Sequence, residues 1–585
     1  MNKEWSLDIL YKGYDDPAFK ADFNNVEVMQ EEMHKKILEL PNMTEEEALI
    51  AGLKASEAFS ELLEKLFSYI SLRQSTDTTN PESMALIGQL QQKYTSSIKD
   101  GLAFQKYIAN VKDLDAVIAG NDYLKEYEFY LKENKKSCEH LLEDNVEEMI
   151  TKMNLTGGAA WGDLFSFLSS TVEAEYDGKS ITLSDVRNLA HDADPAVRKK
   201  AYEAELACYK KIEAPVAFAL NNIKKQVNML SEAHGYASPL AMTLEQSRMT
   251  QDTLDALWTA CREYFPKFQE YMRRKAELLG YENGLPWFEM FAPIGKVEKT
   301  FTAEEAKDYL VTLFGNFSDD MAEMMRRAFD ESWMDFYPRP GKVGGAFCSN
   351  LTSQKQSRIL LNFNGSLSSV DTMAHELGHA YHGQQIEDHL PLNRGYSMPV
   401  AETASTFNEN VLMSFAIDQA EGEEKLGLIE SMLQDVNQTI CDIYSRFLFE
   451  SAVFENAKTQ FLFPEQLKEL MLNAQKEAYG NGLDPEYLHP YMWCCKGHYF
   501  SEGLSFYNFP YAFGALFAKG LYAIYKQEGE AFVPKYRELL KATTVSSVED
   551  VAKMVGADIT KPDFWRNSLA LIAENIDEFI RLTNK

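Results

Sequence analysis

The stretch SLSSVDTMAHELGHAYHGQQI, residues 366–386, predicts the helix around which the rest of the chain is organised. Serine hydroxyls at its start can cap a helix, and no proline occurs from residue 366 to residue 390. On a helix, His375 and His379 project from one face, one turn apart. Two neutral imidazoles at this spacing can bind one Zn²⁺ at about 2 Å. Glu376 can then reach a water molecule at the open coordination position and act as its general base.

Glu402, in the stretch AETASTFNE at residues 401–409, is the candidate for a third ligand. Pro391, Gly395 and Pro399 predict a loop between the first helix and a second helix that packs across it. Two histidines, one glutamate and one water form the ligand set of a catalytic zinc site. Taken alone, HELGH could be a helix with two solvated histidines, and Glu402 could be a surface acid at a helix start. Together they favour a site for one zinc ion.

Two further carboxylates are expected to orient the histidines. Asp371 lies four residues before His375 on the same helical face, so we expect it to accept the remaining N–H of that histidine. Glu409 lies one helical heptad after Glu402, and we expect it to do the same for His379. Such partners fix the tautomer and the ring orientation of a histidine that binds metal.

Composition and charge exclude several classes of partner. The 585 residues carry a formal net charge of −31, with 45% hydrophobic and 12% aromatic residues, as in a globular protein. This length predicts two or three domains, or one large helical body. The negative charge argues against nucleic acid and anionic membranes as partners, because phosphates would be repelled. No run of about 18 apolar residues is present, so no membrane span is expected.

The cysteines and the N-terminus predict a cytoplasmic protein. Seven cysteines are scattered without a CxxC pair, which is typical of free thiols in a reducing compartment. The first residues, MNKEWSLDILYKGYDDPAF, lack the long apolar stretch of a secretory signal.

Helical patterns dominate the chain and predict a mainly α fold. Residues 1–195 contain one helical run after another, and Thr44 with Glu47 forms a capping box at the start of one of them. The segment 176–183 predicts a turn with a short strand pair. We therefore expect a helical N-terminal domain at residues 1–195 and a second domain, with the candidate metal site, at residues 196–585.

A small β-sheet is expected just before the metal-binding helix. Residues 341–347, GKVGGAF, and residues 358–363, RILLNF, are β-branched or aromatic runs bounded by glycine. The edge of such a sheet could hold the backbone of an extended peptide, or the strands could be plain scaffold.

The stretch CCKGHYFSEGLSFYNFPYAFGALF, residues 494–517, concentrates phenol side chains beside one histidine. Attack of water on a carbonyl creates an oxyanion, which a hydroxyl or N–H group at about 2.7–3.1 Å would stabilise. His498, Tyr507 and Tyr511 are the candidates for this role. Periodicity alone favours an aromatic core helix instead, so both interpretations stay open at this point.

Five motifs occur in order along the chain: GKVGGAF at 341–347, ILLNFNG at 359–365, HELGHAYHG at 375–383, AETASTFNE at 401–409 and FYNFPYAFG at 506–514. Together they resemble the thimet oligopeptidase family of zinc metallopeptidases, and the oligoendopeptidase F branch is the most similar. The match covers residues 200–575, and the opening WSLDILY resembles the helical N-terminal domain of that branch. Two departures are visible. KVGGAFC stands where many members have an arginine and a Tyr-Ser ending, and Gly514 stands where thimet-type enzymes have a tyrosine.

This resemblance implies a mainly α-helical, clam-like fold with a deep substrate channel. It also implies zinc-dependent endopeptidase activity on short peptides, with one zinc ion per chain. By their positions in the motifs, His375, His379 and Glu402 match the zinc ligands of the family. Glu376 matches its general base, and Asp371 falls where the family has a carboxylate one turn before the first histidine.

The same resemblance places His498, Tyr507 and Tyr511 in the region that binds substrate and stabilises the oxyanion. Two other functions stay open. One is a dipeptidyl carboxypeptidase-type exopeptidase on the same fold, and the other is a catalytically silent helical protein that binds peptides. Glu376 argues against the silent protein, because a binding module gains nothing from a base beside a metal.

Overall fold

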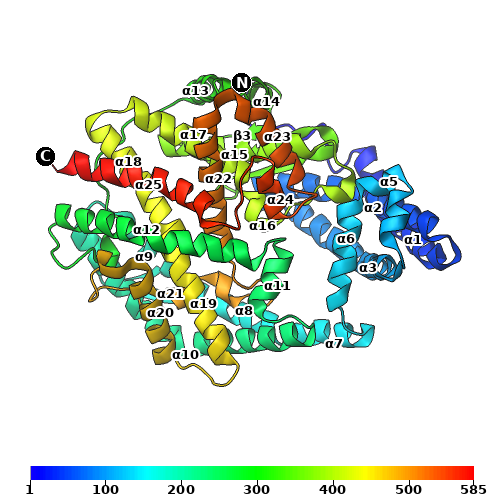
Figure 1. The fold of residues 1–585 in the computed structure, drawn as a ribbon, viewed down its shortest axis with the longest axis horizontal. Helices are drawn as coiled ribbons and strands as arrows, with labels where there is room; N and C mark the ends of the chain where they lie inside the picture. The colour runs from blue at the N-terminus through cyan, green and yellow to red at the C-terminus, as the bar shows by residue number, and fades with distance from the viewer. Residues whose placement is uncertain (1, 585) are drawn as a thin grey trace.

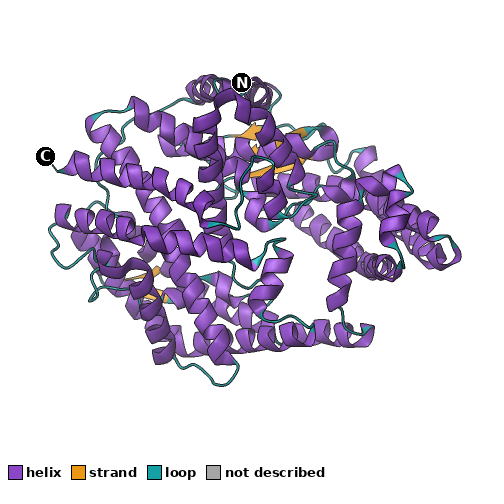
Figure 2. Cartoon of the chain, in the orientation of Figure 1, coloured by secondary structure: helices purple, strands orange, loops and turns teal. Residues whose placement is uncertain are grey.

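Helices form nearly all of the molecule, as Figure 2 shows, and the strands are few and short. The computed structural model describes residues 2–584. The mainly α fold predicted from the sequence is confirmed. No helix within residues 2–584 is both long enough and apolar enough to cross a membrane.

Six helices form a lobe at the right of Figure 1. They are α1 (Pro17–Glu39), α2 (Glu45–Thr76), α3 (Pro81–Asn110), α4 (Leu114–Ala119), α5 (Asp122–Glu126) and α6 (Glu128–Ser137). α1, α2 and α3 pack around a hydrophobic core that includes Leu49, Leu66 and Tyr69. α2 begins with the predicted capping box, in which Thr44 and Glu47 accept hydrogen bonds from each other's backbone N–H groups.

The other helices form a larger body with a core of its own. The first of them are α7 (Asp144–Asn154), α8 (Gly158–Thr171), α9 (Leu183–Asn188), α10 (Pro195–Ala233), α11 (Pro239–Gln246), α12 (Gln251–Leu278), α13 (Ala303–Gly315) and α14 (Asp319–Asp330). Next come α15 (Leu367–Ile386), α16 (Met398–Ala401), α17 (Thr403–Gln419), α18 (Gly422–Asn437), a π-helix (Gln438–Asp442), α19 (Ile443–Ala457) and α20 (Pro464–Tyr479). The last are α21 (Met492–Cys495), α22 (Phe509–Glu528), α23 (Phe532–Ala542), α24 (Val548–Lys553) and α25 (Pro562–Thr583). α25 packs along α12, so the end of the chain lies against its middle (Figure 1).

Hydrophobic packing changes from the core of the lobe to the core of the body between Leu131 and Phe165. Phe165 on α8 belongs to the body because its ring stacks on Phe500 at a centroid distance of 3.8 Å. The predicted strand pair is confirmed as the antiparallel hairpin β1 (Glu173–Tyr176) and β2 (Lys179–Thr182). β1 packs against α10 and therefore also lies in the body.

A three-stranded sheet lies beside α15, as the sequence predicted. Its strands, in spatial order, are β3 (Met334–Asp335), β5 (Gln356–Leu360) and β4 (Phe347–Leu351). β5 pairs in parallel with β3 and antiparallel with β4. The position of the first predicted strand is wrong, because residues 341–346 form a loop. Gly341 and Gly345 have φ angles of 84° and 77°, a backbone conformation that favours glycine and does not continue a strand.

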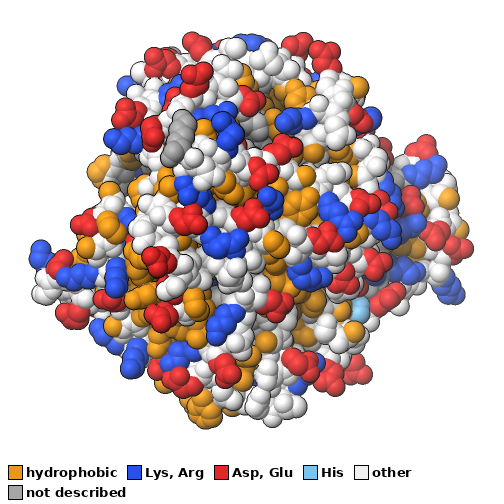
Figure 3. All heavy atoms as spheres, turned by 60° about the vertical axis from the view of Figure 1, so that its left-hand side comes forward, with side chains coloured by type: hydrophobic (Ala, Val, Ile, Leu, Met, Phe, Trp, Pro, Cys, Tyr) orange, Lys and Arg blue, Asp and Glu red, His pale blue; other side chains and the backbone are white. Residues whose placement is uncertain are grey.

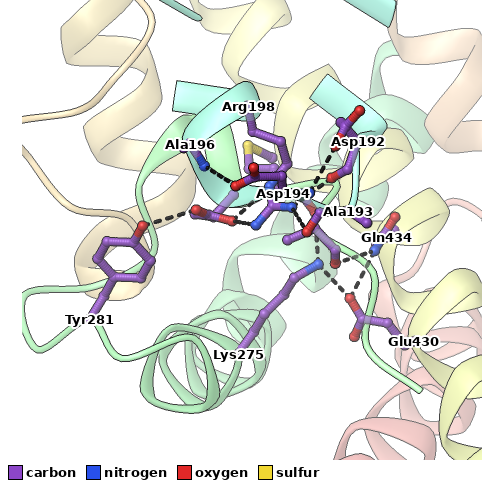
Figure 4. Close-up of polar contacts among 12 residues, drawn as sticks. Asp192, Ala193, Asp194, Ala196, Arg198, Lys275, Tyr281, Glu430 and Gln434 are labelled. Atoms are coloured by element: carbon purple, nitrogen blue, oxygen red, sulfur yellow. Dashed lines mark hydrogen bonds and ion pairs between the residues drawn. The ribbon is translucent and has the colours of Figure 1, made fainter. Parts of the chain in front are cut away.

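Two buried ion pairs join parts of the body that are far apart in the sequence (Figure 4). Lys275 on α12 pairs with Glu430 on α18, and the exposed fractions of the two side chains are 0% and 2%. Arg198, near the start of α10, pairs with Glu289, which also accepts a hydrogen bond of 2.9 Å from the hydroxyl of Tyr281. The first pair joins α12 to α18, and the second joins α10 to the segment after α12 that contains Glu289.

Charged side chains of both signs cover the face of the molecule that Figure 3 draws. Acidic and basic groups are interspersed there with apolar atoms. On this face, the acidic groups behind the net charge of −31 are therefore spread out and not gathered at one point.

Candidate metal centre

α15 carries the HELGH motif and begins where the sequence predicts a helix. The hydroxyl oxygen of Ser366 accepts a hydrogen bond of 3.1 Å from the backbone N–H of Ser369 and so caps the helix. His375 and His379 lie one turn apart, and their Nε2 atoms are 3.2 Å from each other. The two imidazoles therefore point into one place, as the spacing of the motif requires.

Glu402 lies at the junction between α16 and α17. Its carboxylate oxygen Oε2 is 3.3 Å from Nε2 of His375 and 3.2 Å from Nε2 of His379. The hydroxyl of Ser405 donates a hydrogen bond of 2.7 Å to the same oxygen and holds it in this position. The structure thus brings all three predicted ligands together.

The spacing of these three atoms fits a divalent metal ion. In a tetrahedral zinc site with bonds of about 2.0–2.1 Å, two ligand atoms lie roughly 3.3–3.4 Å apart. The observed separations are 3.2, 3.2 and 3.3 Å. Glu376 also lies within 4.8 Å of both imidazoles. Glu402 is the better candidate for the third ligand, because its oxygen is closer to both histidines.

Close packing of α15 against α17 positions Glu402. Gly378, inside HELGH, faces the backbone of α17, and a methyl group added to it would lie 2.5 Å from the carbonyl oxygen of Ala404. Further along α17, the side-chain amide of Asn408 donates a hydrogen bond of 3.0 Å to the carbonyl of Ala374. Later residues of α17 therefore meet earlier residues of α15, so the two helices run antiparallel.

Glu409 contacts His375, whereas the sequence predicted His379 as its partner. A hydrogen bond of 2.7 Å joins Nδ1 of His375 to Oε1 of Glu409. The prediction was wrong because α17 runs antiparallel to α15, so a residue two turns beyond Glu402 reaches the first histidine and not the second. Burial alone would lower the pKa of His375, but hydrogen bonds to Glu402 and Glu409 raise it to about 10.

Asp371 lies one turn before His375, as predicted, but does not bond to it. Within residues 2–584 no hydrogen bond joins the two side chains, because Glu409 takes Nδ1 of His375. Oδ1 of Asp371 is buried without a hydrogen-bond partner among the described residues. Burial, followed by the charge of Glu409, raises the pKa of Asp371 well above its ordinary value. The predicted contact between Asp371 and His375 is therefore wrong.

Glu376 is buried beside the two imidazoles. Its side chain is 5% exposed, and Oε2 has no hydrogen-bond partner in the described part of the chain. Burial raises the pKa of its carboxyl group, while His375 and His379 act in the opposite direction. A buried, unpartnered carboxyl group next to two potential metal ligands can exchange a proton with a nearby water molecule.

His498, Tyr507 and Tyr511 form one cluster. The ring of Tyr507 lies 5.0 Å from that of His498 and 5.2 Å from that of Tyr511, measured between centroids. Tyr511 is 40% exposed, which argues against a role as a core residue. Gly514, one turn later on α22, packs beside Glu402, since a methyl group added to it would lie 3.6 Å from Cβ of Glu402. Of the three residues, Tyr511 lies on α22, one turn before the glycine that packs beside Glu402.

Two residues that support the site were absent from the sequence prediction. Ser405 lies three positions after Glu402 on α17, so helical spacing could have indicated its bond to that carboxylate. Asn408 bonds to Ala374 on another helix, and no local pattern indicates such a contact.

Two family models match the chain. Peptidase family M3 matches residues 188–571, and oligopeptidase F matches residues 109–173. Oligopeptidase PepF of Bacillus subtilis (strain 168) is 24% identical over 594 residues, which cover 99% of this chain and 87% of that protein. Group B oligopeptidase PepB of Streptococcus agalactiae serotype III (strain NEM316) is 24% identical over 538 residues, which cover 90% of this chain and 88% of that protein.

Solved structures share the fold. A candidate peptidase from Chlamydophila abortus superposes with a TM-score of 0.85 at 21% identity, covering 99% of this chain and 98% of that one. Oligoendopeptidase-F from Enterococcus faecium superposes with a TM-score of 0.71 at 18% identity, covering 97% and 98%. These likenesses establish the fold, and the family model covers more than half of the residues. The chain therefore belongs to peptidase family M3.

Proposed function

We propose that this chain is a zinc-dependent endopeptidase that hydrolyses internal peptide bonds of short oligopeptides in the cytoplasm. Membership of peptidase family M3 supports the hydrolysis of peptide bonds. The relatives named oligopeptidase PepF and group B oligopeptidase PepB support short peptides as the substrate class. The observation that carries the proposal is the triangle of donor atoms from His375, His379 and Glu402, 3.2–3.3 Å apart, beside the buried Glu376.

His375, His379 and Glu402 would hold the zinc ion. When bound, zinc supplies a Lewis acid that polarises the scissile carbonyl and lowers the pKa of water. Ser405 keeps Oε2 of Glu402 directed at the two imidazoles. Glu409 accepts the hydrogen bond from Nδ1 of His375 and so leaves Nε2 of that ring for the metal.

Glu376 would act first as the general base and then as the general acid. Its Oε2, which has no hydrogen-bond partner among the described residues, can take a proton from the attacking water and later deliver this proton to the leaving amine. Burial raises the pKa of this carboxyl group. A raised pKa makes this carboxylate a stronger base than an ordinary glutamate.

His498, Tyr507 and Tyr511 would stabilise the oxyanion and orient the substrate. Their hydroxyl and N–H groups are hydrogen-bond donors of the type that an oxyanion needs. β4 is an edge strand that packs against α15. Its free edge offers N–H and C=O groups with which an extended peptide backbone can pair.

Metal analysis of the purified protein together with a peptidase assay tests this function. The substrate is an internally quenched peptide that is blocked at both ends, so only internal cleavage releases the signal. We expect about one zinc ion per chain, loss of cleavage with a chelator, and recovery on adding zinc.

The same assay separates the alternatives. Cleavage restricted to peptides with a free C-terminus, two residues at a time, would favour a dipeptidyl carboxypeptidase. Peptide binding without any cleavage by the zinc-loaded protein would favour a silent binding protein.

A further inference from the structure

A cavity of about 350 Å³ lies beside the candidate metal centre, between α15, α17, α18 and α22. Among these four helices, α17 packs against each of the other three. They lie in the upper part of Figure 1. The volume lies within the range of sites for small molecules. Part of the lining is apolar and consists of Met413, Leu428, Met432, Val436, Leu516 and Ile572. This part can receive an aliphatic group.

Two residues that line the cavity carry a donor group without a hydrogen-bond partner among the described residues. Lys519 on α22 is 7% exposed, and its ammonium group makes no hydrogen bond or ion pair within residues 2–584. Asn410 on α17 is also 7% exposed, and its Nδ2 has no hydrogen-bond partner in the described chain. Buried donors are costly to leave unpaired. A ligand carboxylate would satisfy both and would form a charged hydrogen bond with the lysine.

The start of α15 strengthens the case for a carboxylate. Leu367 and Ser368, the first residues of this 20-residue helix, line the same cavity. Free backbone N–H groups and the helix dipole give a helix N-terminus a partial positive charge. This charge adds to that of the lysine ammonium group.

Carboxyl groups on the same lining can bind a positive group as well. Asp371 lines the cavity, and its buried Oδ1 has no hydrogen-bond partner among the described residues. Asp435 on α18 and Glu409 on α17 also line it. A ligand that satisfies both the unpaired acceptor and the unpaired donors carries an ammonium group and a carboxylate.

We propose that this cavity binds a free aliphatic amino acid as its zwitterion. The ammonium group lies at Asp371 and Asp435, the carboxylate lies at Lys519 and Asn410, and the side chain packs against the apolar lining. The cavity is distinct from the proposed reacting site. Glu376 is not among the described residues that line it, and neither are the members of the His498 cluster.

An amino acid bound in the cavity would affect the metal centre through Glu409. This side chain lines the cavity and also accepts the hydrogen bond from Nδ1 of His375. A ligand ammonium group near Glu409 competes with the histidine for the carboxylate. We therefore expect the amino acid to inhibit as a product of peptide breakdown, and this step rests on the proposed function.

Calorimetry on the full-length Glu376→Gln protein tests binding without turnover, with L-leucine as the probe. We expect one site per chain for L-leucine. N-acetyl-leucine lacks the ammonium group and leucinamide lacks the carboxylate, so each should bind about tenfold to a hundredfold more weakly. Equal affinity for all three compounds, or no binding of L-leucine at millimolar concentration, would overturn the proposal.

Lys519→Met, made in the same protein, locates the site. The change keeps the length of the side chain but removes the ammonium group, so affinity for L-leucine should fall about tenfold or more. Lys526→Met, at an exposed position of the same helix, is the matched control and should bind normally. Unchanged affinity in a folded Lys519→Met protein would place the ligand elsewhere and end the proposal. If this variant does not fold, the comparison of L-leucine with its two analogues still tests the proposal.

The two proposals fail in different ways. A protein that shows no peptidase activity yet binds L-leucine through Lys519 would contradict the proposed function and leave the cavity site standing. An active peptidase that binds L-leucine no better than its two analogues would contradict the cavity site and leave the proposed function standing.

Discussion

Glu376 and Glu402, at the candidate metal centre, have opposite electrostatic environments. Burial acts to raise the pKa of Glu402, but hydrogen bonds from His375 and His379 lower it far below its ordinary value. Glu376 has an unpartnered oxygen in the described chain, and burial raises its pKa. Glu402 is thus held as an anion between two imidazoles, while Glu376 is free to exchange a proton.

Glu376→Gln should keep the metal ion and lose most turnover. The amide has the same shape but cannot accept the proton, so we expect kcat to fall by about 10²–10⁴-fold. Zinc analysis and kcat on the doubly blocked peptide measure the two effects. Asp388→Asn, which changes an acid just beyond α15 with a 73% exposed side chain, is the control. Near-normal activity of Glu376→Gln would rule out its role as the base.

The two carboxylates near His375 should differ in their effect on metal affinity. Glu409→Gln removes the anion that holds Nδ1 of His375, so we expect zinc affinity to fall about 10–100-fold. Asp371→Asn should have a smaller effect, because no hydrogen bond joins Asp371 to that histidine in residues 2–584. Competition with a chromophoric chelator measures both dissociation constants. A larger loss of zinc affinity in Asp371→Asn than in Glu409→Gln would contradict the role of Glu409 as the partner of His375.

At the scale of elements, the site depends on how closely α15 approaches α17. Glycine at position 378 removes the Cβ atom that would separate the two backbones. The antiparallel direction then brings Glu402 to both histidines and Glu409 to His375 alone. The loop before α16 has to reverse the chain for this packing to form.

Gly378→Ala should weaken metal binding although it replaces no ligand. The added methyl group would lie 2.5 Å from the carbonyl oxygen of Ala404 and 2.6 Å from Cα of Ser405, so the helices have to move apart. Overpacking of this kind costs about 1–3 kcal/mol. Zinc titration and urea unfolding check both effects. Gly395→Ala is the control, because no atom lies within 4 Å of its added methyl group. If both variants bind zinc equally well, the close approach is not essential.

At the scale of the whole molecule, a helical lobe and a larger body each have a hydrophobic core. β4 connects the two, because Leu351 packs in the core of the lobe while the strand contacts α15 in the body. Inside the body, the pair of Lys275 and Glu430 links α12 to α18 (Figure 4). Burial lowers the pKa of Lys275, and the charge of Glu430 opposes this shift.

Lys275→Met should reduce the free energy of unfolding by about 3–5 kcal/mol, because Glu430 would remain buried without its cation. Lys132→Met, which removes the ion pairs that a lysine with a 46% exposed side chain makes with Asp115 and Glu128, is the surface control and should change the free energy of unfolding far less. Adding Glu430→Leu to Lys275→Met should recover part of the loss. Urea unfolding measures all of these variants. A loss in Lys275→Met no larger than in the control would mean that the buried pair does not hold α12 and α18 together.

The sequence by itself determined the features that depend on neighbouring residues. Helical period predicted that His375 and His379 share one face, and backbone hydrogen bonding predicted the cap at Thr44. Such features need only a few residues to be in regular structure, so the local pattern specifies them.

Only the tertiary structure decided how distant segments meet. It directed Glu409 and not Asp371 to His375, because the direction in which α17 crosses α15 is set by packing along the whole length of both helices. It also brought Lys519 and Asn410 from separate helices to one cavity. No local sequence pattern predicts either contact. The free energy of packing between distant segments decides which residues meet, and the conformation of one segment alone does not.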